Sequence, residues 1–200
     1  MKASSKYSDF IEYLNAGKLC VFETDTVVGV ACTILNDGKT NNNIQRIYDI
    51  KNRTRDKALP WLISSKEMLN EWAININEYA EDFIKEKWPG ATTLVFEVND
   101  RLPEGLGVNT AKDQHTVAFR IPNCEELINA IDFVGCPVAC TSANLSGDHA
   151  PKTLDRVPKK LLEQVDFVYE KKQKPSGEPS QIISCIGENS EILRAGGSGA

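Results

Sequence analysis

The sequence predicts a single α/β domain over residues 1–200, in which helices flank a twisted mixed β-sheet. Two observations predict it. Short apolar runs rich in β-branched residues alternate along the chain with segments of helical spacing, which is typical of α/β domains. The length of 200 residues, with 41% hydrophobic and 26% charged residues, suits one globular domain, and no internal repeat or linker divides it.

The predicted strands are short apolar runs bounded by turn-forming residues. Residues 26–33 and 92–98 are the richest in β-branched side chains, and residues 115–121 alternate polar with apolar side chains. Pro60 predicts that its strand lies at an edge or a bulge of the sheet. In chain order the predicted strands are residues 19–22, 26–33, 58–63, 92–98, 115–121, 136–141, 165–169, 181–186 and 191–194.

Helices are predicted where apolar side chains recur every three or four residues. We expect Ser5 or Ser8 to cap the first helix and Gly17 to close it, while Ser64 or Ser65 starts the third. In chain order the predicted helices pass through residues 10–14, 44–50, 64–69, 76–87 and 124–133.

Three polar segments leave the ends of predicted strands, at residues 23–26, 142–147 and 176–180. In α/β folds ligands bind at such strand ends. Arg120 and Thr116 share one face of their strand. Neither a P-loop nor a Rossmann glycine motif occurs, so a nucleotide would have to be held by side-chain cations and hydroxyls. The residues alone therefore predict a cleft for an anionic ligand.

Residues 51–57 place four cations and one carboxylate in seven positions of an acidic chain. In an extended backbone Lys51, Arg53, Arg55 and Lys57 would share one face and could bind an anion. A solvated charged turn is the alternative.

The overall charge argues against a protein that coats nucleic acid, since the net charge is -5 and the pI is about 5.2. The N-terminus lacks the apolar core of a secretory signal, and no apolar run approaches the length of a membrane span. We therefore expect a cytoplasmic protein with no membrane partner.

The six cysteines are expected to be reduced, mostly buried thiols. Cys136, Cys140 and His149 offer at most a partial metal site with no evident fourth ligand, so we expect no metal site. A Cys–His nucleophile that uses His115 or His149 has no support beyond chance pairing.

Motifs between residues 23 and 196 resemble, in order, those of one family, the short single-domain YrdC-like threonylcarbamoyl-AMP synthases, whose fold is the YrdC/RibB-like α/β fold. The motifs are Glu23-Thr-Asp-Thr-Val-Val-Gly-Val30, Ile47-Tyr-Asp-Ile-Lys-Asn-Arg53, Trp88-Pro-Gly90, Phe119-Arg-Ile-Pro-Asn123, Thr141-Ser-Ala-Asn-Leu-Ser-Gly147 and Ile192-Leu-Arg-Ala-Gly196.

The resemblance implies a reaction of L-threonine, bicarbonate or CO2, and ATP that gives threonylcarbamoyl-adenylate and pyrophosphate for tRNA threonylcarbamoyladenosine synthesis. Mg2+ would accompany ATP, and no prosthetic group is implied. No dedicated catalytic residue is expected, because the carbamate formed from threonine itself attacks the α-phosphorus. The implied downstream partners are threonylcarbamoyl-transferase proteins that act on tRNA, and weak RNA binding is also considered.

The resemblance also implies which residues bind each substrate. Arg120 would pair with the threonine carboxylate, for which a guanidinium fork is suited, and Cys140 would contact threonine through its backbone. The implied threonine-binding residues are Thr26, Arg120, Cys140 and Ser180. The implied ATP-binding residues are Lys51, Arg53, Lys57, Thr116, Ser142, Asn144 and Arg194. For Asn144 the alternative is a role in ordering its loop, and for Thr116 a purely structural role in its strand.

Some residues depart from the family pattern in ways that bear on substrate preference rather than on the fold. Glu23 and Val28 replace a usual Pro and Tyr, Trp61 an expected β-branched residue, and Ala195 a Pro. Two other functions are considered: an RNA-binding module of the same fold, and a carbamoyl-adenylate enzyme of the hydrogenase-maturation kind. The latter usually carries zinc-finger-like cysteine pairs, which this sequence lacks.

Overall fold

The computed structural model describes residues 2–4, 6–34, 42–99, 109–111, 114–170, 174–187 and 190–196. The strands within these ranges form one mixed sheet with helices around it, which confirms the predicted α/β class. The strands are β1 (Lys2–Ser4), β2 (Cys20–Glu23), β3 (Val28–Thr33), β4 (Trp61–Leu62), β5 (Ala73–Ile74), β6 (Thr92–Val98), β7 (Asn109–Ala111), β8 (Gln114–Arg120), β9 (Val138–Ser142), β10 (Phe167–Tyr169), β11 (Gln181–Ser184) and β12 (Glu191–Arg194).

The strand order brings segments that are distant in sequence side by side. In the described residues it is β1-β10-β2-β3-β9-β4-β8-β6-β11-β12, with β5 paired to β6 and β7 to β8. The antiparallel pairing of β3 with β9 sets Gly29 opposite Ser142, and the parallel pairing of β6 with β11 sets Thr92 opposite Gln181. The polar segments predicted to carry the site therefore meet at one region of the sheet.

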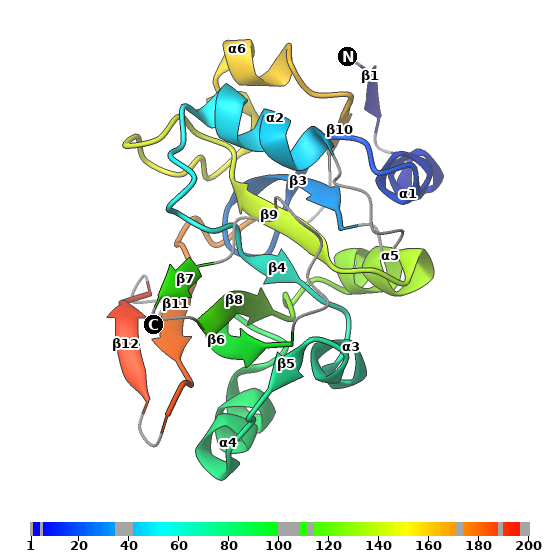
Figure 1. Cartoon of the computed structure of the whole chain (residues 1–200). Helices are drawn as coiled ribbons and strands as arrows, with labels where there is room; N and C mark the ends of the chain where they lie inside the picture. The colour runs from blue at the N-terminus through cyan, green and yellow to red at the C-terminus, as the bar shows by residue number, and fades with distance from the viewer. Residues whose placement is uncertain are drawn as a thin grey trace.

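The helices surround the sheet in three groups. Figure 1 shows α1 beside α5, α2 beside α6, and α3 and α4 together beyond β5. The closest helix packing joins α1 to α5 and β10, and α2 to β3. The helices are α1 (Tyr7–Asn15), α2 (Asn42–Lys51), α3 (Lys66–Asn70), α4 (Glu78–Lys87), α5 (Glu125–Val134) and α6 (Lys159–Leu162), with a 3-10 turn at Leu154–Arg156.

Side-chain caps and left-handed residues set several helix ends. The Ser65 hydroxyl accepts a hydrogen bond from Met68 N at 3.2 Å, so Ser65 caps α3 as predicted. Gly17, with φ +64°, follows α1 and closes it as expected. The cap predicted at Ser8 is wrong, because Ser8 lies inside α1 and Lys6 precedes the helix without a side-chain cap bond. Ser5 lies outside the described residues.

The position of β4 contradicts the edge placement, which was one of the two alternatives predicted from Pro60. The strand lies in the interior of the sheet, between β9 and β8, rather than at an edge. Only Trp61 and Leu62 pair with the neighbouring strands, while the Pro60 carbonyl accepts a hydrogen bond from Cys140 N at 2.8 Å. A proline is tolerated there because its missing N–H falls just before the first paired residue.

Aromatic side chains pack around β4. The Trp61 ring meets Trp72 and Phe119 edge to face, with ring centroids 5.2 and 5.5 Å apart. Trp61 is 1% exposed and belongs to the continuous hydrophobic core. Trp61, which departs from the family pattern, therefore packs in the hydrophobic core from an interior strand of the sheet.

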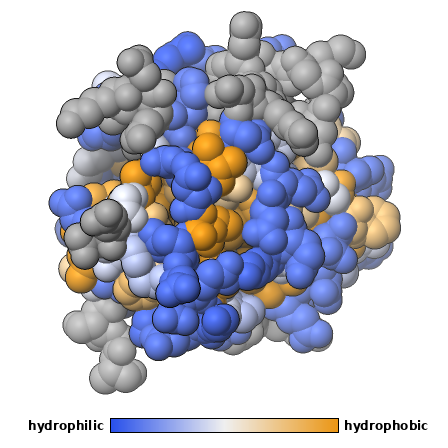
Figure 2. Space-filling model, turned by 60° about the horizontal axis from the view of Figure 1, so that its bottom comes forward, coloured by the Kyte–Doolittle hydropathy of each residue, from blue (hydrophilic) through white to orange (hydrophobic). Residues whose placement is uncertain are grey.

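The outer surface on the face shown in Figure 2 is bordered by hydrophilic side chains, with apolar surface gathered towards the middle. Within the described ranges no helix combines the length and apolar character needed to cross a bilayer.

Replacing Trp61 by Ala should lower the free energy of unfolding by about 3–5 kcal/mol, since a large side chain is removed from a packed core. Urea unfolding followed by circular dichroism measures the change. Ile192→Ala is the control, because Ile192 is 63% exposed and its loss should cost less than about 0.5 kcal/mol. Equal effects of the two substitutions would contradict the packing described for Trp61.

Candidate functional site

A cavity of about 360 Å3 opens at the strand ends. Its walls come from the turn between β2 and β3, the end of β9 with the loop that follows it, and residues 179–180, together with Arg120 and Arg194. This volume is within the range of small-molecule pockets. The three polar segments predicted from the sequence therefore do line one cavity.

Seven of the eleven predicted binding residues line the cavity, including all four implied threonine residues. These seven are Thr26, Arg120, Cys140, Ser142, Asn144, Ser180 and Arg194. The four that do not line it all come from the implied ATP set: Lys51, Arg53, Lys57 and Thr116.

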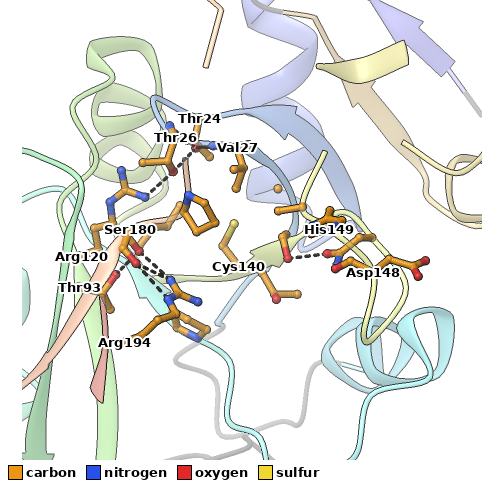
Figure 3. A pocket seen from close by; sticks show the side chains of 18 residues that line it. Thr24, Thr26, Val27, Thr93, Arg120, Cys140, Asp148, His149, Ser180 and Arg194 are labelled. Carbon is orange, nitrogen blue, oxygen red and sulfur yellow. Dashed lines mark hydrogen bonds between the residues drawn. The ribbon is translucent and has the colours of Figure 1, made fainter. Parts of the chain in front are cut away.

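The two ends of the cavity differ in chemistry. Figure 3 shows Arg120, Ser180 and Arg194 gathered at one end, while Asp148 and His149 lie at the other. The first end offers two guanidinium groups and hydroxyl groups, the combination that recognises a carboxylate or a phosphate.

Arg120 is held by three residues from two segments, and it is only 5% exposed. Its Nε donates to the Gly90 carbonyl at 2.7 Å, and its Nη1 donates to Thr26 Oγ1 at 2.8 Å. Its Nη2 donates to both carboxylate oxygens of Asp25, at 2.7 and 2.6 Å. Burial lowers the pKa of Arg120 and the Asp25 carboxylate opposes that shift, so the pairing keeps a charged group stable inside the protein.

The Trp88-Pro-Gly90 segment fixes the carbonyl that receives Arg120. Trp88 Nε1 donates to the Thr92 carbonyl at 2.6 Å, and Gly90 N donates to the Ile121 carbonyl at 2.9 Å. A Cβ on Gly90 would lie 2.3 Å from the Lys87 carbonyl oxygen, so a side chain does not fit without moving the backbone. The glycine of this motif is thus explained by close packing beside the site.

Arg194 joins the two implied substrate sets. It donates to the Ser180 carbonyl from Nη2 at 2.6 Å and from Nε at 3.1 Å. The Ser180 hydroxyl lies 2.8 Å from Thr93 Oγ1. Burial, and secondly the positive charge of Arg120, lower the pKa of Arg194. An implied ATP residue therefore contacts an implied threonine residue, and the two cations act on the same end of the cavity.

Thr24 organises the turn that presents Thr26. Its hydroxyl accepts hydrogen bonds from the backbone N–H groups of Thr26 and Val27, at 3.1 and 3.2 Å, and donates to the Val27 carbonyl at 2.8 Å. The hydroxyls of Thr24 and Thr26 lie 3.0 Å apart. The sequence Thr-Asp-Thr thus supplies one residue that shapes the turn and one that faces the cavity.

Lys51 lies behind the cavity rather than in its wall, and it is 2% exposed. Its ammonium group donates to the Ser142 carbonyl, to the Asn144 carbonyl at 2.6 Å and to Asn144 Oδ1 at 3.2 Å. Its own carbonyl accepts a hydrogen bond from Ser146 N at 2.8 Å. In this structure Lys51 therefore orders the loop that presents Ser142 and Asn144, and direct contact with ATP stays a prediction.

The expectation that residues 51–57 form an extended cationic face is wrong. Lys51 ends α2, and the chain then turns at Asn52, which has φ +49°. Arg53 folds back and donates from Nε to the Lys57 carbonyl and from Nη2 to the Ala58 carbonyl, both at 2.8 Å. Lys51 and Arg53 therefore donate to different main-chain carbonyls and do not form one shared cationic face.

Thr116 is buried on β8 and lies on the same face of the strand as Arg120, as predicted. It pairs with Glu97 of β6 and Asn109 of β7. Thr116 does not line the cavity, so its implied contact with ATP stays a prediction.

Cys140 lies in the middle of the cavity wall (Figure 3). Burial raises the pKa of its thiol to about 12, so the group is neutral near pH 7. All six cysteines are free and all but Cys136 are buried, which confirms the prediction of mostly buried thiols. The described residues include no group of three or more His, Cys, Asp or Glu placed to hold a metal ion.

Several contributors to the site were not predicted from the sequence. Asp25 and Gly90 hold Arg120, and Thr93 holds Ser180. Asp25 and Gly90 stand inside two of the quoted motifs, which is a signal that could have identified them. Thr93 has no such signal, since a threonine is ordinary in a strand.

Comparison with known proteins places the chain in a family. The model of the Sua5/YciO/YrdC family, described as "Telomere recombination", matches residues 12–196. The chain belongs to the Sua5/YciO/YrdC family. The family domain covers most of the sequence, and it includes the motifs that line the cavity.

The chain is similar to several members of this family. A relative from Methanocaldococcus jannaschii is 30% identical over 185 residues, which are 92% of this chain and 82% of its own length. The threonylcarbamoyl-AMP synthase of Pyrococcus abyssi is also 30% identical over 185 residues, but this chain spans only 52% of its length. The crystal structure of Pyrococcus abyssi Sua5 complexed with L-threonine has a TM-score of 0.83 and 30% identity, covering 96% of this chain and 54% of that one.

A side chain added at Gly29 should collide with Cys140, because a Cβ there would lie 2.7 Å from Cys140 Sγ. Gly29→Ala should therefore destabilise this Sua5/YciO/YrdC domain by about 1–3 kcal/mol. In the double variant Gly29→Ala/Cys140→Ala the sulfur is gone and part of the loss should be recovered. Urea unfolding of the four proteins measures the coupling, and simple addition of the two single effects would contradict the contact.

Lys51 should make stability depend on pH. Burial, and secondly the Arg53 charge, lower its pKa from 10.5 to about 8. Between these values the unfolded chain binds more protons than the folded one, so the stability that Lys51 contributes rises as the pH increases from 8 to 10.5. The free energy of unfolding of the wild type, minus that of Lys51→Met, should therefore grow across this window. A difference that stays constant or shrinks would contradict the shifted pKa.

Proposed function

We propose that this protein is a threonylcarbamoyl-AMP synthase, which converts L-threonine, bicarbonate or CO2, and ATP into threonylcarbamoyl-adenylate and pyrophosphate. The observation that carries the proposal is the buried, charged Arg120 at the end of a cavity that also exposes the hydroxyl-bearing residues Thr26 and Ser180. This arrangement suits a small amino acid with a carboxylate and a polar side chain. The named relative from Pyrococcus abyssi and the threonine complex of its Sua5 support the same substrate.

The chemistry proceeds in two steps. The neutral amine of threonine attacks CO2, a nitrogen–carbon bond forms, and the amine proton passes to water, leaving a carbamate. A carbamate oxygen then attacks the α-phosphorus of ATP, and the bond to the bridging oxygen breaks as pyrophosphate leaves with the electron pair. The protein's part is to position the two reactants and to stabilise negative charge.

The cavity divides between the substrates in a way that fits this order of bond formation. Threonine lies with its carboxylate at Arg120 and its side chain towards Thr26 and Ser180. ATP enters from the side of Ser142 and Asn144. Arg194 lies beside Ser180. From there the Arg194 charge can stabilise both the carbamate and the α-phosphate that the carbamate attacks.

Mg2+ is proposed to arrive with ATP. It prefers oxygen ligands and commonly keeps waters while binding substrate phosphates and one or two carboxylates. Asp148 is among the residues of the cavity wall, and its carboxylate would have to turn towards the cavity to reach such an ion. When bound, Mg2+ would neutralise part of the negative charge of the ATP phosphates.

The product sets the proposed partners. A carbamoyl-adenylate is an activated, hydrolysable acyl phosphate, so a transferase that acts on tRNA must consume it promptly. A cytoplasmic location accords with such a partner and stays a prediction. RNA binding by residues 51–57 would depend on the exposed Arg55 and Lys57, and it is the outcome expected if the enzymatic assay fails.

Purified protein should release pyrophosphate only when ATP, threonine and bicarbonate are all present with Mg2+. Arg120→Ala should raise the KM for threonine by at least about tenfold, since a charged hydrogen bond is lost, while the KM for ATP changes little. A coupled pyrophosphatase assay measures both. Release that is independent of threonine, or absent in the wild type, would contradict the proposed function.

A further inference from the structure

Asp25 is a charged residue of the site that the proposed reaction does not use. Its side chain is 12% exposed and makes an ion pair with Arg120 at 2.6 Å, while the Arg120 side chain is 6% exposed. Asp25 does not line the cavity. The recorded partner of its carboxylate is Arg120, so an effect of Asp25 on the substrate would pass through Arg120.

We propose that Asp25 is a positioning residue, whose carboxylate fixes the orientation and balances the charge of the guanidinium that receives the substrate carboxylate. This inference rests on the proposed function, because it concerns recognition of the amino acid. It adds a specificity-determining contact behind the residues that face the cavity.

Asp25 fixes the direction of the Arg120 guanidinium. The donors of Arg120 are divided among its partners, with Gly90 at Nε, Thr26 at Nη1 and Asp25 at Nη2. A guanidinium has five N–H donors, two of them on each terminal nitrogen. Thr26 takes one donor of Nη1, and the second has no acceptor among the described residues, so it stays available to a ligand carboxylate.

The Asp25 carboxylate also sets the net charge at this end of the cavity. Arg120 and Arg194 bear on the same end of the cavity, and the charge of Arg120 contributes to the lowered pKa of Arg194. Burying a guanidinium is costly unless a counter-charge accompanies it. Among the described residues Arg120 is paired with Asp25 and Arg194 has no ion pair, so these two cations carry one uncompensated positive charge, which matches one carboxylate. Without Asp25, two uncompensated cations would repel each other and the ordered fork would be lost.

The main chain of the turn that contains Asp25 also holds the segment that carries Ser180. The Asp25 main-chain carbonyl accepts a hydrogen bond from Ser176 N at 2.9 Å, and the neighbouring Thr26 carbonyl accepts one from Gly177 N at 2.7 Å. The loop that carries Ser180 is thus fixed to the same turn. Changing only the Asp25 side chain leaves these main-chain bonds available, so its effect can be separated from loss of the wall.

The test uses Asp25→Asn in the full chain, because asparagine keeps the shape and removes the charge. Calorimetric titration with L-threonine should show binding weakened by at least about tenfold, and steady-state assays should show the same change in the KM for threonine. The KM for ATP should change by less than about twofold. Asp25→Glu should recover part of the affinity. Asp155→Asn is the matched control, since the Asp155 side chain is 77% exposed.

A second measurement tests the pairing itself. Arg120→Ala leaves the Asp25 carboxylate buried without its cation, so the protein should lose stability. Adding Asp25→Asn to that variant should restore part of the loss, whereas two independent structural roles would give losses that add.

Three outcomes would overturn the inference: unchanged threonine affinity in Asp25→Asn, tighter binding of threonine, or equal weakening of threonine and ATP together with a lower melting temperature. Tighter binding would identify Asp25 as a carboxylate that competes with the substrate. If the wild type itself fails to bind threonine, the proposed function fails and the inference with it. The two failures are distinguishable, since the first three outcomes require a wild type that binds.

Discussion

The site depends on satisfying one buried guanidinium. Arg120 sits at the end of a central strand, where water cannot reach most of its donors, and an unpaired cation in that position would cost several kcal/mol. Its partners come from the turn after β2 and from the tripeptide that ends α4, which lie far from β8 in the sequence. Folding must therefore bring these segments together before the charge can be accommodated, and the cavity is the space that they enclose.

Several cationic side chains of this acidic chain donate hydrogen bonds to main-chain carbonyls of the protein itself. Lys51 and Arg53 use their donors on main-chain carbonyls of neighbouring loops, so the electrostatic cost of burying them is offset by hydrogen bonds that define loop shape. Arg194 does the same for the segment before β11. A basic residue can thus shape an anion site by ordering the loops around it. The basic residues of 51–57 do not form one continuous binding surface, although their clustering in the sequence would suggest it.

The sequence predicted the class of the fold, most strands and the convergence of the polar segments, because β-branched runs and polar strand ends have direct physical signatures. It did not predict the interior position of β4, since the two residues of this strand pair with Phe119, Arg120, Val138 and Ala139, which lie far along the chain. The two-residue β5 also falls below the length at which periodicity can be recognised. The role of Asp25 required coordinates, because a carboxylate in a turn looks the same whether it faces solvent or a buried arginine.

The loop of residues 176–180 is attached to the site through its backbone. The bonds from Ser176 N and Gly177 N reach main-chain carbonyls of Asp25 and Thr26, so they do not depend on which side chains the loop carries. Gly177 is constrained by its φ of +83°, but Glu178 and Pro179 are not bound by this requirement. Substitutions at these positions can therefore change the surface of the cavity wall while the main-chain hydrogen bonds keep the loop in place. The loop is thus a place where related enzymes can diverge in the amino acids they accept.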